Sequence, residues 1–195
     1  MSVQKMIPII SAQDIGALGP IDYLVNNAST LGVTPLQLLL DTDCETFESV
    51  LQTNLIGPFR LTKAALPSLL LNGEGTVVNI SSDAAVNGYA KWGAYGVSKA
   101  GLDQLSRVWS AELAEHGVRF VSIDPGDMNT PMHAAAIPDA DFASLKNPRT
   151  AALELLEFLS DRASDQTSTR ASDRASDLST DKAQQHRVSF QRRSL

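Results

Sequence analysis

Three short apolar runs alternate along this chain with two long segments that are predicted to be helical. The apolar runs are "IDYLVNNA" at 21–28, "GTVVNISS" at 75–82 and "VRFVSIDPG" at 118–126. Their length and their β-branched residues favour strands that are buried on both faces. The helical segments cover 43–71 and 93–116. Strands that alternate with long helices predict an α/β fold around a parallel sheet, with helices on both of its faces.

Individual residues set the expected ends of the two helices. Asp43 is a candidate N-cap for the first helix, and Gly57-Pro58 predicts a break inside it. Gly117 is expected to end the second helix, because glycine readily adopts the left-handed conformation that closes a helix.

The C-terminal part of the chain has a different composition. From Ser160 the sequence is polar and repetitive, and "RASD" occurs at 162–165, 170–173 and 174–177. Such a segment has too few apolar side chains to offset the entropy lost on ordering. The sequence therefore predicts one folded unit over residues 1–159 and a disordered tail over 160–195.

Composition excludes several classes of protein. The 195 residues are 43% hydrophobic and 19% charged, which is typical of a soluble globular domain. The formal net charge of −6 argues against a general nucleic-acid binder. No apolar run reaches the length of a membrane span, and "MSVQKMIPIISAQ" is too short and polar for a signal peptide. The single cysteine, Cys44, fits a reducing compartment, so the expected location is the cytoplasm.

Polar side chains follow each of the three predicted strands. In an open parallel sheet, ligands bind outside the carboxyl ends of the strands. The residues at those ends are Asn26, Asn27, Ala28 and Ser29, then Ser81 and Ser82, then Asp124, Pro125 and Gly126. Tyr95 and Lys99 lie near the start of the helix that follows the second strand. The assumed topology thus brings these groups to one edge of the sheet.

The pair Tyr95 and Lys99 is a weak signal alone, since residues four apart on a helix are often only surface neighbours. The signal becomes specific in combination with four other segments. These are "DYLVNNAS" at 22–29, "TNLIGPF" at 53–59, "VNISS" at 78–82 and "DPGDMNTP" at 124–131, together with "YGVSK" at 95–99. In this order and spacing the chain resembles the short-chain dehydrogenase/reductase family over roughly residues 20–150.

The resemblance implies a Rossmann-like three-layer α/β/α fold and an NAD(P)-dependent oxidoreductase that interconverts a small carbonyl and an alcohol. It implies that Tyr95 is the general acid/base and that Lys99 lowers the phenol pKa from its ordinary value of about 10. Ser82 would hydrogen-bond the substrate oxygen, and Asn54 would support a proton-relay water. Tyr89 is a weaker candidate for the acid/base because a glycine, and no lysine, stands four residues after it.

The resemblance also implies contacts with the cofactor, NAD or NADP. Asn26 and Ala28 would line its adenosine ribose, and Lys99 would bind the nicotinamide ribose together with Tyr95. The nicotinamide would lie against Pro125 and Gly126, with Thr130 reaching its carboxamide. No metal site is predicted.

One departure from the family affects the cofactor. The sequence has no Gly-x-x-x-Gly-x-Gly turn after a strand, which in the family holds the pyrophosphate, and only about twenty residues precede "DYLVNNAS". We therefore expect an N-terminally truncated domain, in which residues 6–10 keep the last strand of the otherwise missing half. We also expect weak binding of the pyrophosphate. The family's final strand also has no convincing match, and the nearest run is "RVSF". An alternative is an inactive relative that acts as a scaffold, and in either case we expect a homo-oligomer through the helices at 43–71 and 93–116.

Overall fold

The computed structural model describes residues 19–172 and 187–189. Within them the chain forms a four-stranded sheet in the order β1-β2-β3-β4, and all neighbouring strands are parallel. The strands are β1 (Tyr23–Asn26), β2 (Gly75–Ile80), β3 (Val118–Asp124) and β4 (Arg187–Ser189). The predicted strands at 21–28, 75–82 and 118–126 are confirmed, each ending two residues earlier than expected.

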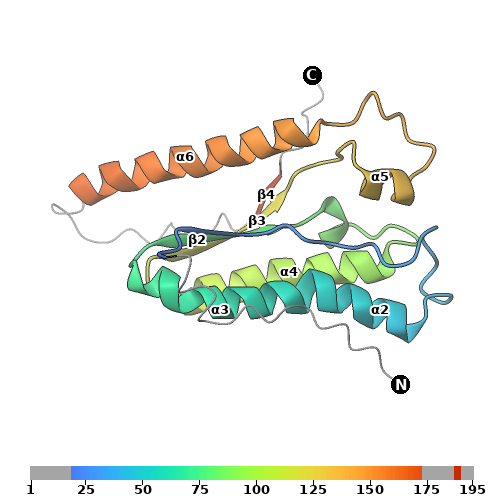
Figure 1. Cartoon of the computed structure of the whole chain (residues 1–195), viewed down its shortest axis with the longest axis horizontal. Helices are drawn as coiled ribbons and strands as arrows, with labels where there is room; N and C mark the ends of the chain where they lie inside the picture. Colours follow the sequence, from blue (N-terminus) through green and yellow to red (C-terminus); the bar gives the residue numbers. More distant parts are fainter. Residues whose placement is uncertain (1–18, 173–186, 190–195) are drawn as a thin grey trace.

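Helices cover both faces of this sheet (Figure 1). One face carries α2 (Cys44–Leu51), α3 (Gly57–Leu71) and α4 (Gly93–Glu112), and the opposite face carries α6 (Pro148–Ser172). A short helix, α5 (Pro131–Ala136), lies between β3 and α6 along the chain. The three-layer α/β/α architecture predicted from the sequence is therefore confirmed.

The helix predicted over 43–71 does not break at Gly57-Pro58. A π-helical turn, Gln52–Ile56, joins α2 and α3 without interruption. Pro58 has no N–H to donate to the carbonyl of Asn54, and the wider turn accommodates this loss because Gly57 donates to the carbonyl of Gln52. Asp43 is the N-cap as predicted, accepting a 2.6 Å hydrogen bond from the Thr46 amide.

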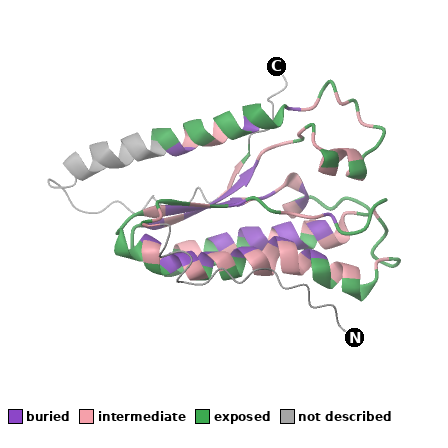
Figure 2. Ribbon diagram, in the orientation of Figure 1, coloured by how far each residue is buried: buried purple, intermediate pink, exposed green. Residues whose placement is uncertain are grey.

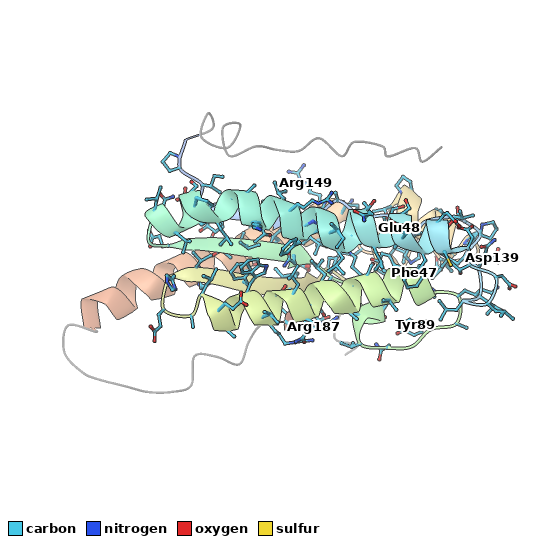
Figure 3. The ribbon with its side chains drawn as sticks, turned by 90° about the horizontal axis from the view of Figure 1, so that it is seen from below. Phe47, Glu48, Tyr89, Asp139, Arg149 and Arg187 are labelled. Atoms are coloured by element: carbon cyan, nitrogen blue, oxygen red, sulfur yellow. The ribbon has the colours of Figure 1, made fainter. Side chains whose placement is uncertain are left out.

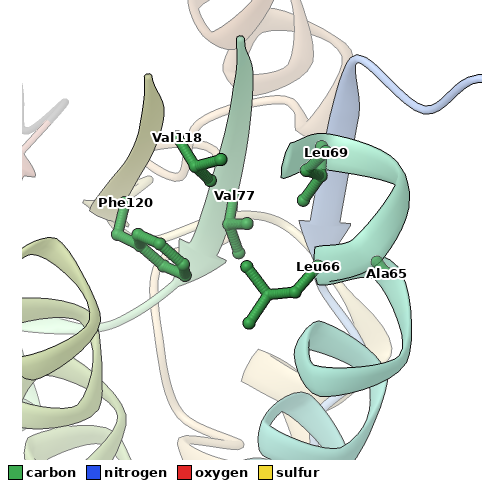
Figure 4. Packing of buried hydrophobic residues seen from close by; sticks show 6 residues of the cluster. All are labelled: Ala65, Leu66, Leu69, Val77, Val118 and Phe120. Atoms are coloured by element: carbon green, nitrogen blue, oxygen red, sulfur yellow. The ribbon is translucent and has the colours of Figure 1, made fainter. Parts of the chain in front are cut away.

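Two apolar clusters hold the layers together. The cluster beneath α3 and α4 contains Ala65, Leu66, Leu69, Val77, Val118 and Phe120 (Figure 4). The cluster on the other face contains Val78, Val121, Ile123 and Leu159, against which Val188 packs. Successive residues of β2, Val77 and Val78, thus point to opposite faces, and both are fully buried, as expected for a parallel strand between two helical layers. Figure 2 shows the same pattern, with buried residues concentrated on the strands and on the sheet-facing side of the helices.

Two elements of the structure lie within residues 160–195, the segment for which the sequence predicts disorder. Helix α6 continues to Ser172, because no glycine or proline interrupts residues 160–172 and Leu159 anchors the helix in the core. The other element is β4, which pairs with β3 and occupies the edge position for which the sequence offered only "RVSF". Residues 173–186 and 190–195 lie outside the described residues, as does the strand predicted at 6–10.

Candidate active site

The site is built at the carboxyl ends of β1, β2 and β3. The register pairs Asn26 with Asn79 and Ile80 with Ile123, so these strands end at nearly the same level. Helix α4 begins beside this edge and carries Tyr95 and Lys99 in its first two turns. The structure therefore brings together the groups that the sequence placed at separate strand ends.

Tyr95 lies in a small apolar cluster above the edge of the sheet. The residue is 9% exposed and packs against Leu31 and Ala84. Trp92 contacts its ring edge-on, with a centroid separation of 5.6 Å. These contacts surround the ring with apolar side chains, and the hydroxyl is its polar end.

Lys99 is almost fully buried, with 2% of its surface exposed. Its ammonium lies 5.6 Å from the centroid of the Tyr95 ring and donates a 2.7 Å hydrogen bond to the carbonyl of Ile80, the last residue of β2. The lysine therefore joins the start of α4 to the carboxyl edge of the sheet, and it holds a positive charge beside Tyr95.

Burial sets the acidity of both groups. It raises the pKa of Tyr95 to about 12, because a buried phenolate is poorly solvated, while the hydroxyls of Ser82 and Ser29 act in the opposite direction. Burial lowers the pKa of Lys99 to about 8, and the Asp103 carboxylate partly opposes this change. The expected lowering of the Tyr95 pKa by Lys99 is not found, because burial dominates and the side chains that act on this pKa are Ser82, Ser29, Asp124 and Asp83. At neutral pH the pair consists of a neutral phenol and a largely protonated lysine.

Ser82 directs its side chain toward Tyr95 from a tight turn. Its Oγ accepts a hydrogen bond from the Ala84 amide (3.2 Å) and donates to Oδ1 of Asp83 (3.1 Å). Ser81, the residue before it, is 3% exposed, and its amide continues the sheet ladder by donating to the carbonyl of Ile123 (2.7 Å). Ser82 is therefore the serine whose hydroxyl affects the Tyr95 pKa.

Ser29 also belongs to the site, although no role was predicted for it from the sequence. Its Oγ is buried without a hydrogen-bond partner among the described residues, and its hydroxyl lowers the pKa of Tyr95. A buried hydroxyl without a partner is uncommon in folded proteins and marks a place where a ligand oxygen could bind. The feature of the sequence that could have pointed to Ser29 is its position directly after Asn26-Asn27-Ala28, at the end of the first strand.

Asn54 is fully buried in the π-helical turn. Its side chain accepts from the Thr30 amide (2.8 Å) and donates to the Thr30 carbonyl (2.8 Å) and to Oγ of Ser98 (3.0 Å). Ser98 in turn donates to the carbonyl of Tyr95 (2.6 Å). Asn54 thus fastens the loop after β1 to the first turn of α4, so that the Ser29 and Tyr95 segments keep their relative position.

The two residues expected at the adenosine ribose have different environments. Asn26 is 6% exposed, and its amide nitrogen donates to Oδ1 of Asn79 (2.7 Å) and Oγ1 of Thr62 (3.3 Å). Its side chain therefore belongs to a buried polar network between the sheet and α3. Ala28 is exposed and lies on the surface of the loop after β1.

The loop after β3 contains the residues expected at the nicotinamide. Gly126 has a φ of 76°, a conformation that favours glycine, and its amide donates to Oδ1 of Asp124 (3.0 Å). Lys146 donates to the carbonyl of Pro125 (3.0 Å) and holds the loop from the side of α6. Thr130 caps α5 by accepting from the His133 amide (3.2 Å), which leaves its hydroxyl hydrogen able to point outward.

A shallow cavity of about 20 Å³ lies beside Tyr95, lined by Leu31, Leu36 and residues of the loop before α2. This volume accommodates roughly one water molecule.

Fold and site together describe a parallel α/β/α protein with a tyrosine, a lysine and two serines at the carboxyl edge of its sheet. The sequence profile of the short chain dehydrogenase family matches residues 4–141. The chain belongs to this family, which confirms the resemblance found in the sequence.

Curated relatives and solved structures agree with this assignment. The 3-oxoacyl-[acyl-carrier-protein] reductase FabG of Thermotoga maritima is 31% identical over 154 residues, which are 75% of this chain and 61% of that protein. The L-xylulose reductase of Bos taurus is 32% identical over 166 residues, which are 78% of this chain and 66% of that protein. The chain thus spans less than two thirds of the length of these two relatives.

Among solved structures, a putative short chain dehydrogenase from Escherichia coli CFT073 complexed with NADPH superposes with a TM-score of 0.67. It is 34% identical, and the match covers 71% of this chain and 57% of that one. An NAD⁺-bound xylitol dehydrogenase has a TM-score of 0.55 at 31% identity, covering 62% of this chain and 48% of that one.

Proposed function

We propose that this protein is an NAD(P)-dependent oxidoreductase that interconverts a small carbonyl compound and its alcohol, with Tyr95 as the group that transfers the proton. The observation that carries the proposal is the convergence on the Tyr95 hydroxyl. The hydroxyls of Ser82 and Ser29 both affect its pKa, and the Lys99 ammonium lies 5.6 Å from its ring. These groups come from three separate segments of the chain, namely the loop after β1, the turn after β2 and helix α4.

The acidity of Tyr95 suits the role of proton donor in carbonyl reduction at neutral pH. With its pKa raised to about 12, Tyr95 keeps its proton and can donate it to a substrate oxygen as negative charge develops there. The Ser29 hydroxyl can donate a hydrogen bond to the same oxygen, and so can the Ser82 hydroxyl once its hydrogen turns away from Asp83. The nearby Lys99 charge stabilises the anion that forms. Each of these interactions strengthens as negative charge builds up on the substrate oxygen.

The residues present fit the nicotinamide-riboside end of the cofactor. The Lys99 ammonium has three hydrogens and uses one on the Ile80 carbonyl, which leaves two for ribose hydroxyls. The Thr130 hydroxyl suits a carboxamide. When bound, the cofactor would supply the hydride. The relatives do not fix the choice of cofactor, because the neighbouring structures hold NADPH in one case and NAD⁺ in another.

The proposal is tested by replacing Tyr95 with phenylalanine in the full chain. The cofactor probes are NADPH, NADH and reduced nicotinamide mononucleotide, which lacks the pyrophosphate and therefore depends only on the contacts described above. Turnover of a panel of small ketones and aldehydes is followed by loss of the reduced nicotinamide absorbance. We expect Tyr95→Phe to lower kcat by about 10²–10⁴-fold.

Tyr23→Phe is the matched control, since Tyr23 is 46% exposed on the edge strand β1 and lies away from the carboxyl edge of the sheet. It is expected to retain wild-type turnover. Equal losses in the two variants, or wild-type turnover in Tyr95→Phe, would remove Tyr95 from its proposed role. A wild-type chain that reduces no carbonyl with any of the three probes would contradict the proposed function itself.

A further inference from the structure

Arg187, at the start of β4, contacts three groups behind the candidate active site. Its Nε donates to Oδ2 of Asp103 on α4 (3.0 Å), and its Nη2 donates to the carbonyl of Ser82 (2.8 Å). The same Nη2 lies 3.6 Å from Oδ2 of Asp124 at the end of β3. In Figure 3 the labelled Arg187 is seen beside α4. One guanidinium therefore links β4 to α4, to β3 and to the turn after β2.

Both carboxylates that Arg187 contacts are buried, Asp103 with 2% and Asp124 with 3% of its surface exposed. Buried carboxylates require a counter-charge, and Arg187 supplies one to each of them. These are also the two carboxylates that act on the candidate catalytic pair, because Asp103 raises the pKa of Lys99 and Asp124 raises the pKa of Tyr95.

The third contact concerns the Ser82 turn. The Ser82 carbonyl accepts hydrogen bonds from Arg187 and from the Ala85 amide (3.0 Å), which closes the short 3₁₀ helix Asp83–Ala85. The same turn directs the Ala84 amide at Oγ of Ser82. The guanidinium therefore fixes the backbone from which the Ser82 hydroxyl projects.

We propose that Arg187 is a positioning residue of the candidate active site, whose guanidinium holds the Ser82 turn and the Asp103 carboxylate in the arrangement that Ser82 and Lys99 require. The inference rests on the proposed function, in which those two residues act on the substrate oxygen and the cofactor. It assigns to the C-terminal strand a part in the site, although β4 contributes none of the groups that would touch the substrate.

A purely structural role for Arg187 is the competing explanation, because β4 is also held by its backbone pairing with β3 and by Val188 in the core. The two explanations predict different patterns of amide hydrogen exchange in the full chain without any cofactor. In Arg187→Met we expect the amides of Ala84 and Ala85 to exchange on the order of tenfold faster or more, as for loss of a hydrogen bond to a charged group. The amides of Val77 and Val78 in the sheet are expected to keep their protection.

Arg119→Met is the matched control, since Arg119 lies near the other end of β3 and donates to Oγ1 of Thr76 (3.1 Å). It is expected to leave Ala84 and Ala85 unchanged. Unchanged exchange of Ala84 and Ala85 in Arg187→Met would overturn the proposal, and so would an equal acceleration at Val77 and Val78.

If Arg187→Met does not fold, Arg187→Lys decides the question, because an ammonium cannot reproduce the forked contact with Asp103 and Ser82. Faster exchange at Ala84 and Ala85 with a protected sheet supports the proposal, and wild-type exchange there overturns it. In the reductase assay, Arg187→Lys is expected to lower kcat while KM stays constant. Because the exchange experiment uses no cofactor, a wild-type chain without turnover would contradict the proposed function and leave the positioning result intact.

Discussion

Replacing Lys99 with methionine is expected to change how the free energy of unfolding depends on pH. The folded protein holds Lys99 with a pKa of about 8, against an ordinary value of 10.5 that applies to the unfolded chain. Between these two values the unfolded state binds more protons than the folded state. The folded state is therefore stabilised as the pH rises through this range and destabilised as it falls, because the buried ammonium must then be protonated.

The magnitude follows from the two pKa values. A difference of about 2.5 corresponds to about 3 kcal/mol, and about 2 kcal/mol of this is recovered between pH 8 and 10. Tyr95 acts in the opposite sense at higher pH. Its pKa is raised from 10 to about 12, so the stability that it contributes is present below pH 10 and is lost as the pH rises toward 12. The measurement is therefore confined to the window from about pH 8 to 10.

The assay is urea unfolding of the full chain at several pH values across this window, with the free energy obtained by linear extrapolation. From pH 8 to pH 10 the free energy of unfolding of wild type should rise by about 2 kcal/mol relative to that of Lys99→Met. Lys63→Met, which removes an exposed lysine from α3, is the control, and its curve should run parallel to that of wild type. If the difference in the free energy of unfolding between wild type and Lys99→Met stayed constant across the window, the reasoning would be refuted. Protonation of the buried lysine would then not affect stability.

Two further predictions concern the fold and use urea midpoints as the measurement. Leu69 has no exposed surface, so Leu69→Ala should lower the free energy of unfolding by about 2–5 kcal/mol. Leu70 is 37% exposed, so Leu70→Ala should lower it clearly less, and equal losses would contradict the assigned core. Gly117 has a φ of +75°, and an added Cβ would collide with the carbonyl oxygen of Gly73. Gly117→Ala should therefore destabilise the fold by at least about 1–3 kcal/mol. Gly88→Ala is the control and should be almost neutral, because no atom lies near its Cβ position.

Local pattern was sufficient for most of the fold. Strands buried on both faces leave continuous apolar runs, and β2 has this pattern because Val77 and Val78 enter different cores. The break expected at Gly57-Pro58 was wrong, because the residue types alone do not decide whether a helix ends at a proline. A proline removes one backbone donor, and a helix can either end there or widen into a π-helical turn. Here the helix continues, with α2 packed against α4 and α3 packed against β1 and β2.

The candidate site was predictable where spacing determines geometry. Tyr95 and Lys99 share a helix face because they are four residues apart, and Ser82 meets Tyr95 because a strand end and the next helix start adjoin in a parallel sheet. The acidity of the pair was not predictable in this way. An ammonium beside a phenol lowers the phenol pKa, but burial raises it, and the degree of burial depends on Leu31 and Ala84, which the spacing does not report.

Arg187 shows a second limit of local pattern. It lies 105 positions from Ser82 and 84 from Asp103, beyond a repetitive segment that offered no apolar pattern. The need for such a residue nevertheless follows from the buried groups themselves. Asp103 sits one turn after Lys99 on the sheet-facing side of α4, and Lys99 already directs its ammonium at the Ile80 carbonyl. A second cation is therefore needed to balance Asp103, and Arg187 supplies it from β4, the strand that pairs with β3. The charge balance of the site thus extends to the far end of the chain, and Arg187 is the side chain through which the last strand can affect Ser82 and Lys99.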